Sequence, residues 1–544
     1  MNSKIVYISD FFADQTLGGA ELNDQELLNI LKTKYKIIKL NSHLVDLDFL
    51  DQHKDCFFII SNFINLSYGC KEKLFDLNYI IYEHDHKYAK SRNPGLFKDF
   101  VINPSKIINF YFYKNANKIL CQSKFHKDIV FKNLQLDNII SLGGNLWSTE
   151  DLNLIRNLNK NEKKDVISIL DSNIAHKNTQ GAISFCNKKE LSYELIKSSN
   201  YQSFLKMMSK NKKFIFLPKT PETLSRIVVE ARMLGCGVIS NQLVGATQED
   251  WFNLKGDDLV DYFLNKRQEI FNIIESLVNS PKTKQNRPII SIVTTFYKAD
   301  DYLEQYLENM TNQTIFDMCE LVLVDTASPG KEKQTCEFYA KKYKNIRYIR
   351  FNNRLSPTEG YNLAFKFANG KYICWSHLDD RKSLDNIEVL YNELKNNHHV
   401  DLVYGDCLVT KNKNERFQDC QSDTLLEHSL KQFSKENMIK CLPGAMPMFT
   451  ARMIDKVGFL DTKNQNFSDD WEFYLRAVDA GLIFKKVNKV VGSYLVGGRS
   501  QMENNLEQRQ EEARLFYKYM HLFGKNFQIY EPYFKQFIRI KNDK

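Results

Sequence analysis

The stretch GKYICWSHLDDR at residues 370–381 contains the most information about the fold. An apolar run from Tyr372 to Trp375 leads directly into the acidic pair Asp379 and Asp380, so we predict that these carboxylates follow the end of a buried strand. Hard divalent cations such as Mg²⁺ and Mn²⁺ are commonly held by one or two carboxylates together with the phosphates of a substrate. Taken alone, such a pair is more often a turn or a helix cap.

Acids also stand at the ends of other predicted elements. Asp325 ends an apolar run, and Asp469 and Asp470 stand at a predicted helix start, where the helix dipole favours ionised carboxylates and one can act as a general base. Arg354 and Asn362 precede the strand that leads into the acidic pair. This alternation predicts an α/β fold with a mostly parallel sheet, whose ligand lies at the carboxyl ends of the strands.

The segment from about 288 to 500 resembles the family 2 glycosyltransferases, which have the GT-A fold. The opening strand and Thr/Tyr loop of that family match residues 291–297, and its nucleotide-binding acid falls at Asp325. The family often has a second Asp at the next position, where this chain has Thr326. The nucleotide-sugar-binding positions that the resemblance implies are Thr295, Asp325, Arg354, Asn362, Asp379 and Asp380.

The metal-binding motif of this family, Asp-any-Asp, falls on residues 377–379 and differs at its first position. His377 replaces the first acid, whereas the last acid, which is the usual direct ligand, is Asp379. His377 could bind the metal, contact the ribose or cap the turn. The resemblance implies a Mg²⁺ or Mn²⁺ cofactor in the C-terminal domain, with Asp379 and His377 as candidate metal ligands.

The acid pair Asp469 and Asp470 matches the positions that carry the catalytic base of the family. Asp470 is the better candidate, and Asp469 stands where the family prefers Glu. The resemblance implies displacement at the anomeric carbon with inversion: Asp470 deprotonates an acceptor hydroxyl, while the metal neutralises the diphosphate leaving group. Residues 441–449 resemble the acceptor-side loop of the family, although an ordinary turn would have the same Gly and Pro content.

The first 280 residues begin in the same way as the second segment. An apolar run at 4–8 precedes Gly18, Gly19 and a helical pattern from Glu21, as at the start of a parallel α/β unit. Similar runs follow at 79–82, 118–121, 138–142, 166–170 and 214–217. We therefore predict two α/β lobes, at about 1–160 and 161–280. The two glycines would let the backbone approach a ligand, although Gly-Gly is also an ordinary turn.

Residues 221–241 carry the strongest motif of the first segment. Glu222 and Glu230 are separated by seven residues and are followed by Gly and a new strand. This resembles the donor-binding motif of the family 4 glycosyltransferases with the GT-B fold. Ser172 replaces the diphosphate-binding Arg of that family, and Lys177 is retained. The donor-binding residues that the resemblance implies are Gly18, Gly19, Lys177, Glu222 and Glu230.

A cluster of acids and imidazoles follows the predicted strand at 79–82. His84 and Asp85 could form an acceptor-side catalytic cluster, or His84 and His86 could hold a metal through their His-any-His spacing. We favour the polar strand-end site. The first segment is then either an active, retaining transferase or a degenerate domain that binds and positions a glycan.

Length and composition are those of a globular protein with several domains. The chain has 544 residues, 43% of them hydrophobic and 26% charged, which predicts two to four units. The polar stretch 281–288 is bracketed by prolines and predicts a linker. The fold class is therefore α/β, with a GT-B-like pair of Rossmann-type lobes followed by a GT-A (nucleotide-diphospho-sugar transferase) domain at 289–520. Residues 521–544 form a basic-aromatic tail, which could lie at a membrane interface or pack on the core.

Charge and cysteine content narrow the class of partners. The net charge of +9 is spread over both signs, which disfavours a nucleic-acid binder and fits an anionic substrate such as a nucleotide diphosphate. The 11 Cys without a CxxC motif predict reduced thiols and a cytoplasmic protein. We find no signal-like N-terminus, and no run of about 18 apolar residues predicts a membrane span.

The sequence therefore predicts a hexosyltransferase-type glycosyltransferase. Its donor would be a nucleotide-diphosphate sugar, and its acceptor a glycan or a lipid-linked saccharide, in the biosynthesis of a surface polysaccharide. We expect no nucleic-acid partner, and peripheral association with the inner face of the membrane is an open alternative. The competing hypothesis is a non-catalytic glycan-binding or scaffold protein with degenerate transferase domains.

Overall fold

The computed structural model describes residues 4–16, 18–198, 200–280, 287–465, 467–497 and 506–538. The chain divides into two units. The first unit comprises Met1–Ile102 and Phe110–Lys284, and the second comprises Asn103–Asn109 and Gln285–Lys544. Most of the predicted linker at 281–288 lies outside the described residues.

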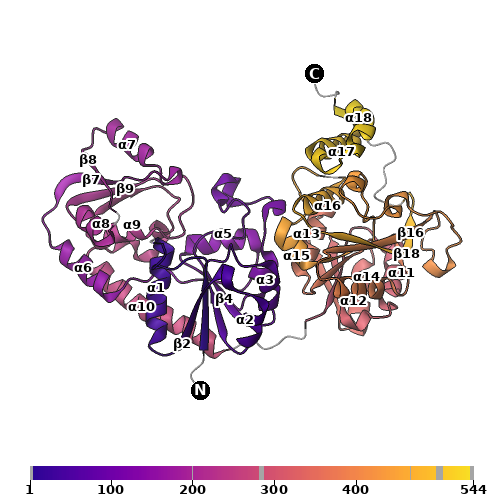
Figure 1. Ribbon diagram of the computed structural model, residues 1–544, viewed down its shortest axis with the longest axis horizontal. Helices are drawn as coiled ribbons and strands as arrows, with labels where there is room; N and C mark the ends of the chain where they lie inside the picture. Colours follow the sequence, from indigo (N-terminus) through magenta and orange to yellow (C-terminus); the bar gives the residue numbers. More distant parts are fainter. Residues whose placement is uncertain are drawn as a thin grey trace. The chain divides into compact units, whose positions relative to one another are not determined.

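The larger sheet of the first unit is parallel, with its six strands in the order β2-β1-β3-β4-β5-β6 (Figure 1). The strands are β1 Lys4–Ser9, β2 Lys36–Asn41, β3 Phe57–Ile60, β4 Asn78–Glu83, β5 Ile119–Cys121 and β6 Ile139–Ser141. The helices are α1 Gly19–Lys32, α2 Leu47–Gln52, α3 Tyr68–Leu74, α4 Phe110–Asn115 and α5 Lys124–Leu134. β3 is buried along its whole length, as expected of a parallel strand covered on both faces.

The second lobe of this unit has a smaller parallel sheet of four strands in the order β10-β9-β7-β8. The strands are β7 Lys164–Leu170, β8 Tyr193–Ile196, β9 Asn211–Phe216 and β10 Gly237–Ser240. The helices are α6 Thr149–Asn159, α7 Thr179–Lys188, α8 Tyr201–Met208, α9 Arg226–Met233 and α10 Asp257–Asn279.

The long helix α10 contributes to both lobes. Its first turns place Leu259 and Phe263 in the core of the second lobe. Its last turns place Ile270 and Ile274 in the core of the first lobe. The two lobes therefore share one helix within a single unit.

The second unit is built on a mixed sheet of eight strands in the order β13-β12-β11-β14-β17-β16-β18-β15. Its strands are β11 Ile290–Phe296, β12 Cys319–Thr326, β13 Ile346–Phe351, β14 Tyr372–Trp375, β15 Arg381–Lys382, β16 Leu402–Thr410, β17 Met448–Thr450 and β18 Phe484–Leu495. Strands β13, β12, β11 and β14 are parallel to one another, whereas β17 is antiparallel to both β14 and β16. The expected parallel sheet accounts for the first half of this sheet but not for the second.

Helices cover both faces of this sheet. The helices are α11 Asp300–Thr311, α12 Glu332–Lys342, α13 Pro357–Phe367, α14 Asn386–Asn396, α15 Ala451–Val457, α16 Asp469–Asp479, α17 Leu506–Lys518 and α18 Lys525–Ile538. α11, α12 and α14 share a core with Ile290 and Cys374. α13 and α16 cover the opposite face, because Phe365 and Phe473 pack on Trp375 and Phe449.

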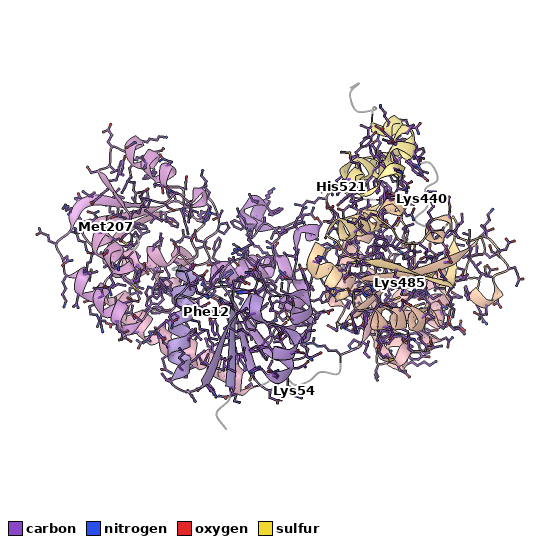
Figure 2. All side chains as sticks on the ribbon, in the orientation of Figure 1. Phe12, Lys54, Met207, Lys440, Lys485 and His521 are labelled. Carbon is purple, nitrogen blue, oxygen red and sulfur yellow. The ribbon has the colours of Figure 1, made fainter. Side chains whose placement is uncertain are left out.

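Helices α17 and α18 pack against each other at the C-terminal end of the described chain. Phe516 of α17 stacks on Phe534 of α18, with ring centroids 4.4 Å apart. The predicted tail thus contains a helix that packs through one face, and residues 539–544 lie outside the described part. None of the helices described here is long and apolar enough to span a membrane. Figure 2 shows the side chains, with Phe12 and Met207 labelled in the first unit and Lys485 on β18.

Candidate functional site in the second unit

The start of helix α13 is fixed by its own sequence. Ser356 is the N-cap, and its hydroxyl accepts a hydrogen bond from the backbone N–H of Glu359. The Glu359 carboxylate accepts the backbone N–H of Ser356 in return, and Pro357 occupies the first helical position. This capping box and proline fix where the helix begins.

One face of α13 contacts both of the predicted acid-bearing segments. The Thr358 hydroxyl donates to Asp469 Oδ2 at 2.7 Å, whereas the Tyr361 hydroxyl lies 2.9 Å from His377 Nδ1. Residues three apart on a helix lie on the same face. The helix therefore brings the Asp469–Asp470 segment and the His377–Asp379 segment to one part of the molecule. Sequence reasoning missed both Thr358 and Tyr361, although the capping box would have placed them on one face.

Thr295, which was expected near a Thr/Tyr loop, lies within β11 and beside α13. The approach is close, because a Cβ atom on Gly360 would clash with Thr295 Oγ1. The Thr295 hydroxyl donates to Val324 O at 3.1 Å, which joins β11 to β12. Arg354 is exposed, and its guanidinium lies 4.6 Å from the ring centroid of Tyr297. The Arg354 side chain forms no ion pair with the described residues, so its charge is available to an anion.

Asp325 lies at the predicted strand end but is fully buried. Its Oδ1 accepts the backbone N–H of Ser328 at 2.8 Å, and its Oδ2 accepts the Tyr348 hydroxyl at 2.6 Å. Arg350 also donates to Oδ2. The carboxylate therefore holds the two β13 side chains against β12, and a contact with a nucleotide stays a prediction.

Asn362 uses its side-chain amide within the protein. Nδ2 donates to Leu460 O at 3.0 Å, and Oδ1 accepts Leu460 N–H at 2.9 Å. These two bonds connect α13 to the segment after α15. The nucleotide contact that the resemblance implies for Asn362 stays a prediction.

The two acids after β14 differ in their surroundings. Asp380 is buried and accepts the backbone N–H of Leu495 at 3.1 Å. Burial, together with the charge of Asp379, raises the pKa of Asp380 well above its ordinary value. Asp379 is partly exposed and accepts no hydrogen bond from any residue in the described ranges. Burial lowers the pKa of His377, which favours the neutral imidazole.

These residues fit a metal ion that a substrate helps to hold. Among the described residues, no group of three or more His, Cys, Asp or Glu side chains is arranged as a complete metal site. Mg²⁺ and similar ions in nucleotide enzymes are commonly bound by one or two carboxylates plus substrate phosphates. Asp379, with its unpaired and partly exposed carboxylate, matches that type of site.

The acid pair at the start of α16 is set apart by its raised pKa values. Asp469 Oδ1 accepts the N–H of Asp470, and Asp470 Oδ1 accepts the N–H of Trp471 at 2.6 Å. The Cys441 thiol lies 3.6 Å from Asp470 Oδ2, as a donor. Burial first and the Asp469 carboxylate second raise the pKa of Asp470 to about 7. A carboxylate with a pKa near neutrality is suited to accept and release a proton.

Glu511 of α17 holds the chain immediately before this acid pair. Its Oε1 accepts the backbone N–H of Ser468 at 2.7 Å and that of Phe467 at 3.1 Å. These donors precede α16, where the orphan N–H groups of a helix require partners. Cys441 begins the segment 441–449 that resembles the family's acceptor-side loop, but its contact with Asp470 was not predicted. The contacts of Glu511 were not predicted either, because each of these two residues lies about 30 to 40 residues from the acid pair.

Candidate functional site in the first unit

Lys177 and Glu222 form an ion pair, with 2.8 Å between Nζ and Oε1. Both side chains are partly exposed. They lie 45 residues apart in the sequence of the second lobe, and their donor-binding role stays a prediction. Ser172 stands at the position of the family's Arg and supplies no positive charge there. Its backbone N–H donates to the Thr179 hydroxyl.

Glu230 is buried and fully engaged. Its Oε1 accepts Trp147 Nε1–H at 3.0 Å and the Tyr201 hydroxyl at 2.8 Å. The Arg226 guanidinium lies 3.3 Å away. Its donor-binding role stays a prediction, because these three groups now surround the carboxylate.

The glycines after β1 lie beside charged side chains. A Cβ on Gly18 would clash with the Glu21 carboxylate, and a Cβ on Gly19 would lie 3.5 Å from the Arg226 side chain. Arg226 belongs to α9 of the second lobe, so the Gly-Gly loop lies where the two lobes of this unit meet.

His84 and Asp85 are both occupied by side chains of the first lobe. His84 Nε2 lies 2.6 Å from Asp24 Oδ1, and its Nδ1 lies 2.6 Å from Gln122 Nε2. Asp85 pairs with Lys87 and Arg92. Their predicted catalytic role therefore has no free imidazole nitrogen and no unpaired carboxylate to support it, and it stays a hypothesis.

A family model matches part of the second unit. Residues 291–458 match the family model Glycosyl transferase family 2. An uncharacterized glycosyltransferase of Methanocaldococcus jannaschii is 20% identical over 228 residues, which are 42% of this chain and 77% of that protein. Part of the second unit is therefore similar to the family 2 glycosyltransferases, and this unit has a mixed α/β sheet. The GT-B assignment of the first unit is not confirmed by these findings.

The names of two further relatives refer to teichoic acid biosynthesis and to chondroitin synthesis. The minor teichoic acid biosynthesis protein GgaB of Bacillus subtilis is 35% identical over 118 residues, 21% of this chain and 13% of that protein. The chondroitin synthase of Escherichia coli is 24% identical over 257 residues, 46% of this chain and 34% of that enzyme. The match thus covers 13% and 34% of the length of these two relatives. A solved mannosyltransferase of Pyrobaculum calidifontis matches 46% of this chain and 68% of its own with a TM-score of 0.34 at 17% identity.

Proposed function

We propose that the second unit transfers a sugar from a nucleotide-diphosphate sugar to a glycan or lipid-linked saccharide. The observation that carries this proposal is the position of α13: one face of it contacts both Asp469 and His377. Asp470, the neighbour of Asp469, has a pKa of about 7 and would therefore act in the same site as the acids that follow β14. The family 2 match over residues 291–458 supports the reaction class.

In the proposed reaction Asp470 acts as the general base. Its carboxylate accepts the proton of an acceptor hydroxyl as the oxygen attacks the anomeric carbon, and the bond to the nucleotide diphosphate breaks on the opposite side. This single displacement inverts the configuration. Asp470 is partly buried, and burial together with the Asp469 charge raises its pKa to about 7, so its proton affinity matches neutral conditions.

The proposed donor site uses the carboxyl ends of β11, β12 and β14. Arg354 would pair with the diphosphate, and Asp325, Asp380, Thr295 and Asn362 would shape the nucleotide side. Asp379 and His377 would hold a Mg²⁺ or Mn²⁺ ion. When bound, that ion would offset the negative charge of the diphosphate leaving group.

The proposed pathway is the biosynthesis of a surface polysaccharide in the cytoplasm. The teichoic acid and chondroitin relatives support this class of product. Membrane association is a separate proposal for α18, which leaves Ile529 69% exposed and Tyr533 41% exposed while Phe534 packs inward. Flotation with vesicles that contain lipid-linked saccharides would test it, and Ile529→Asp should reduce binding.

For the first unit we propose a family 4-like pair of GT-B lobes, at about 1–160 and 161–280, that binds a second donor through Lys177 and Glu222. Turnover in this unit and glycan binding without turnover both stay open. The full chain with both Asp470→Asn and Asp379→Ala distinguishes them, because the second unit then lacks its proposed base and metal ligand, and only an active first unit would still transfer a sugar. Glu222→Gln in that background should then abolish the residual transfer.

The decisive experiment is a donor screen with the full chain. We expect one class of nucleotide sugar to be hydrolysed or transferred, and the turnover to be lost in Asp379→Ala. Asp385→Asn serves as the control, because this carboxylate pairs with Lys489 at the surface. If no donor is turned over while a glycan still binds, the alternative of a non-catalytic scaffold is correct.

A further inference from the structure

A cavity of about 570 Å³ lies in the first unit, directly after the carboxyl end of β6. Ligands of parallel α/β sheets bind at the carboxyl ends of the strands, and small-molecule pockets usually have volumes of about 300–1,000 Å³. The residues on which the chemistry of this cavity depends are Lys124, Gly143, Glu249, Trp251, Tyr262 and Lys266. None of these six belongs to the predicted donor site, so the cavity is a separate feature of the first unit.

Gly143 leaves the space beside two buried charged groups open. Its φ of +65° favours glycine, and a Cβ atom there would lie 3.5 Å from both Glu249 Oε2 and Lys266 Nζ. Glu249 is 6% exposed and Lys266 is 7% exposed, yet these two atoms are too far apart to form an ion pair. The Gly143 carbonyl accepts Trp251 Nε1–H at 2.8 Å, which fixes the loop beside them. A carboxylate oxygen and an ammonium nitrogen therefore both face the point that the glycine leaves open.

Both charged groups keep hydrogen-bonding capacity that the described residues do not use. Glu249 Oε1 accepts the backbone N–H of Lys124 at 2.6 Å, whereas Oε2 has no donor within the described ranges. Lys266 Nζ donates to Glu269 Oε2 at 2.8 Å, and the Tyr262 hydroxyl is a second partner. An ammonium has three N–H groups, so one stays available. Because buried polar groups without partners are unfavourable, a ligand that supplies both a donor and an acceptor would be stabilised here.

The charges around the cavity favour a neutral polar ligand over a phosphate. Lys124 pairs with Asp250 at 2.6 Å. Lys266 pairs with Glu269 at 2.8 Å. Glu249 then adds a carboxylate that has no cation within ion-pair distance in the described part of the chain, and this excess negative charge repels a diphosphate. A hydroxyl group both donates and accepts, so neighbouring hydroxyls of a sugar can donate to Glu249 and accept from Lys266.

Two aromatic rings give the cavity an apolar wall. The ring centroids of Trp251 and Tyr262 lie 5.9 Å apart at an interplanar angle of 33°, and both residues line the cavity. Pockets for small ligands combine such walls with a few polar groups that fix the orientation of the ligand. The C–H face of a pyranose ring fits against an aromatic wall, whereas its hydroxyls fit the charged side of the same cavity.

We propose that this cavity binds one pyranose unit of a neutral glycan, with its hydroxyls on Glu249 and Lys266 and its C–H face on Tyr262. The inference goes beyond the proposed function, because it gives the first unit a saccharide site that takes no part in the chemistry of transfer. Its occupant carries no diphosphate, which distinguishes this site from the donor site proposed at Lys177 and Glu222.

Fluorine NMR of the full chain labelled with 5-fluorotryptophan tests this site directly. The chain has four Trp, and the Trp251 signal is assigned by its loss in Trp251→Phe. The probes are the methyl glycosides of glucose, galactose, mannose, N-acetylglucosamine and N-acetylgalactosamine, with UDP as the charged comparison. We expect at least one glycoside to move the Trp251 signal until it saturates, and UDP to leave it in place.

Two variants of the cavity and one control locate the binding. Glu249→Gln keeps the shape but removes the charge, and we expect glycoside affinity to fall about 10- to 100-fold through the loss of a charge-assisted hydrogen bond. Gly143→Asn tolerates the positive φ but fills the open space, so it should abolish binding. Glu275→Gln is the matched control, because this carboxylate of α10 pairs with Lys34 and does not line the cavity. Thermal denaturation verifies that each variant is folded, and if one cavity variant is not, the other decides.

Three results would overturn the proposal: no glycoside moves the Trp251 signal, a folded cavity variant binds as the wild type does, or UDP moves the signal while the glycosides do not. The last result would identify a nucleotide site. Sugar transfer by a chain whose Trp251 signal no glycoside moves would refute this site and keep the proposed function. Glycoside binding that is lost in Gly143→Asn, in a chain that turns over no donor, would support this site and refute the proposed function.

Discussion

The first unit places acids at and just after the end of β4, and the second unit places an acid pair at the start of α16, in contrasting electrostatic surroundings. In the first unit Lys87 Nζ lies 2.8 Å from Glu83 and 2.7 Å from Asp85, and Arg92 also pairs with Asp85. In the second unit Asp470 receives only backbone N–H and thiol donors. Burial alone would raise the pKa of Asp85, but Lys87 and Arg92 lower it, whereas the pKa of Asp470 rises to about 7. An acid at the end of such an element is therefore available for proton transfer only where no cation neutralises it.

The largest expected effect is the loss of the base in the second unit. Asp470→Asn keeps the size of the side chain but cannot accept the proton, so we expect kcat for sugar transfer to fall about 100- to 10,000-fold. Steady-state rates with the donor found in the screen measure this effect. A general base usually contributes far more than a factor of about ten to kcat. A decrease of less than about tenfold would therefore show that Asp470 is not the general base.

Removing the cation from the acid cluster of the first unit should lower stability. Lys87→Gln removes the ammonium from the buried Glu83, while the partly exposed Asp85 keeps Arg92. Breaking a buried ion pair from one side costs about 3–5 kcal/mol. Chemical denaturation of the full chain measures the free energy of unfolding. Lys54→Gln, at an exposed position, is the control and should change little. Unchanged stability in Lys87→Gln would show that these acids are not held as a compensated pair.

The pH dependence of transfer should report the raised pKa of Asp470. Below pH 7 this carboxylate becomes protonated and cannot accept the acceptor proton, so kcat/KM should fall about tenfold per pH unit on the acidic side. Asp469→Asn removes the neighbouring charge that raises the pKa, and the acidic limb should therefore move to lower pH. A limb that stays in place would assign the titration to another group.

The smallest expected effect comes from the thiol beside the base. The hydrogen bond from Cys441 lowers the pKa of Asp470, so Cys441→Ala should move the acidic limb slightly to higher pH. The direction is opposite to that of Asp469→Asn. A shift in the same direction for both variants would mean that a change of structure, and not of charge, causes them.

The strands that end in acids could be predicted because their apolar runs are continuous and local. The run before Asp379 forms β14, and the run before Asp325 forms β12. β2 was not predicted, because its lysines interrupt the apolar pattern, and β3 has only four residues. The antiparallel strands β16 and β17 were also missed, because which strands pair in a sheet depends on segments far apart in the chain.

The positions of the acids in the candidate site could be predicted from the sequence. The contacts that set the charge and pKa of these acids could not. Asp24 lies 60 residues from His84, and Thr358 lies 111 residues from Asp469. The pattern marks Asn362, yet its amide binds Leu460 while the neighbouring Tyr361 reaches His377. Sequence spacing identifies strand ends and helix starts, whereas charge compensation depends on tertiary packing.

Glu511 has a consequence for the order in which the second unit becomes complete during synthesis. Its carboxylate accepts the two N–H groups that precede the acid pair, yet it is translated about 40 residues after Asp470. A ribosome-bound chain that has not yet released α17 therefore lacks the acceptor that fixes the start of α16. The same holds for a chain from which a protease has removed the C-terminal helices. The position of the proposed base Asp470 thus depends on the presence of helix α17.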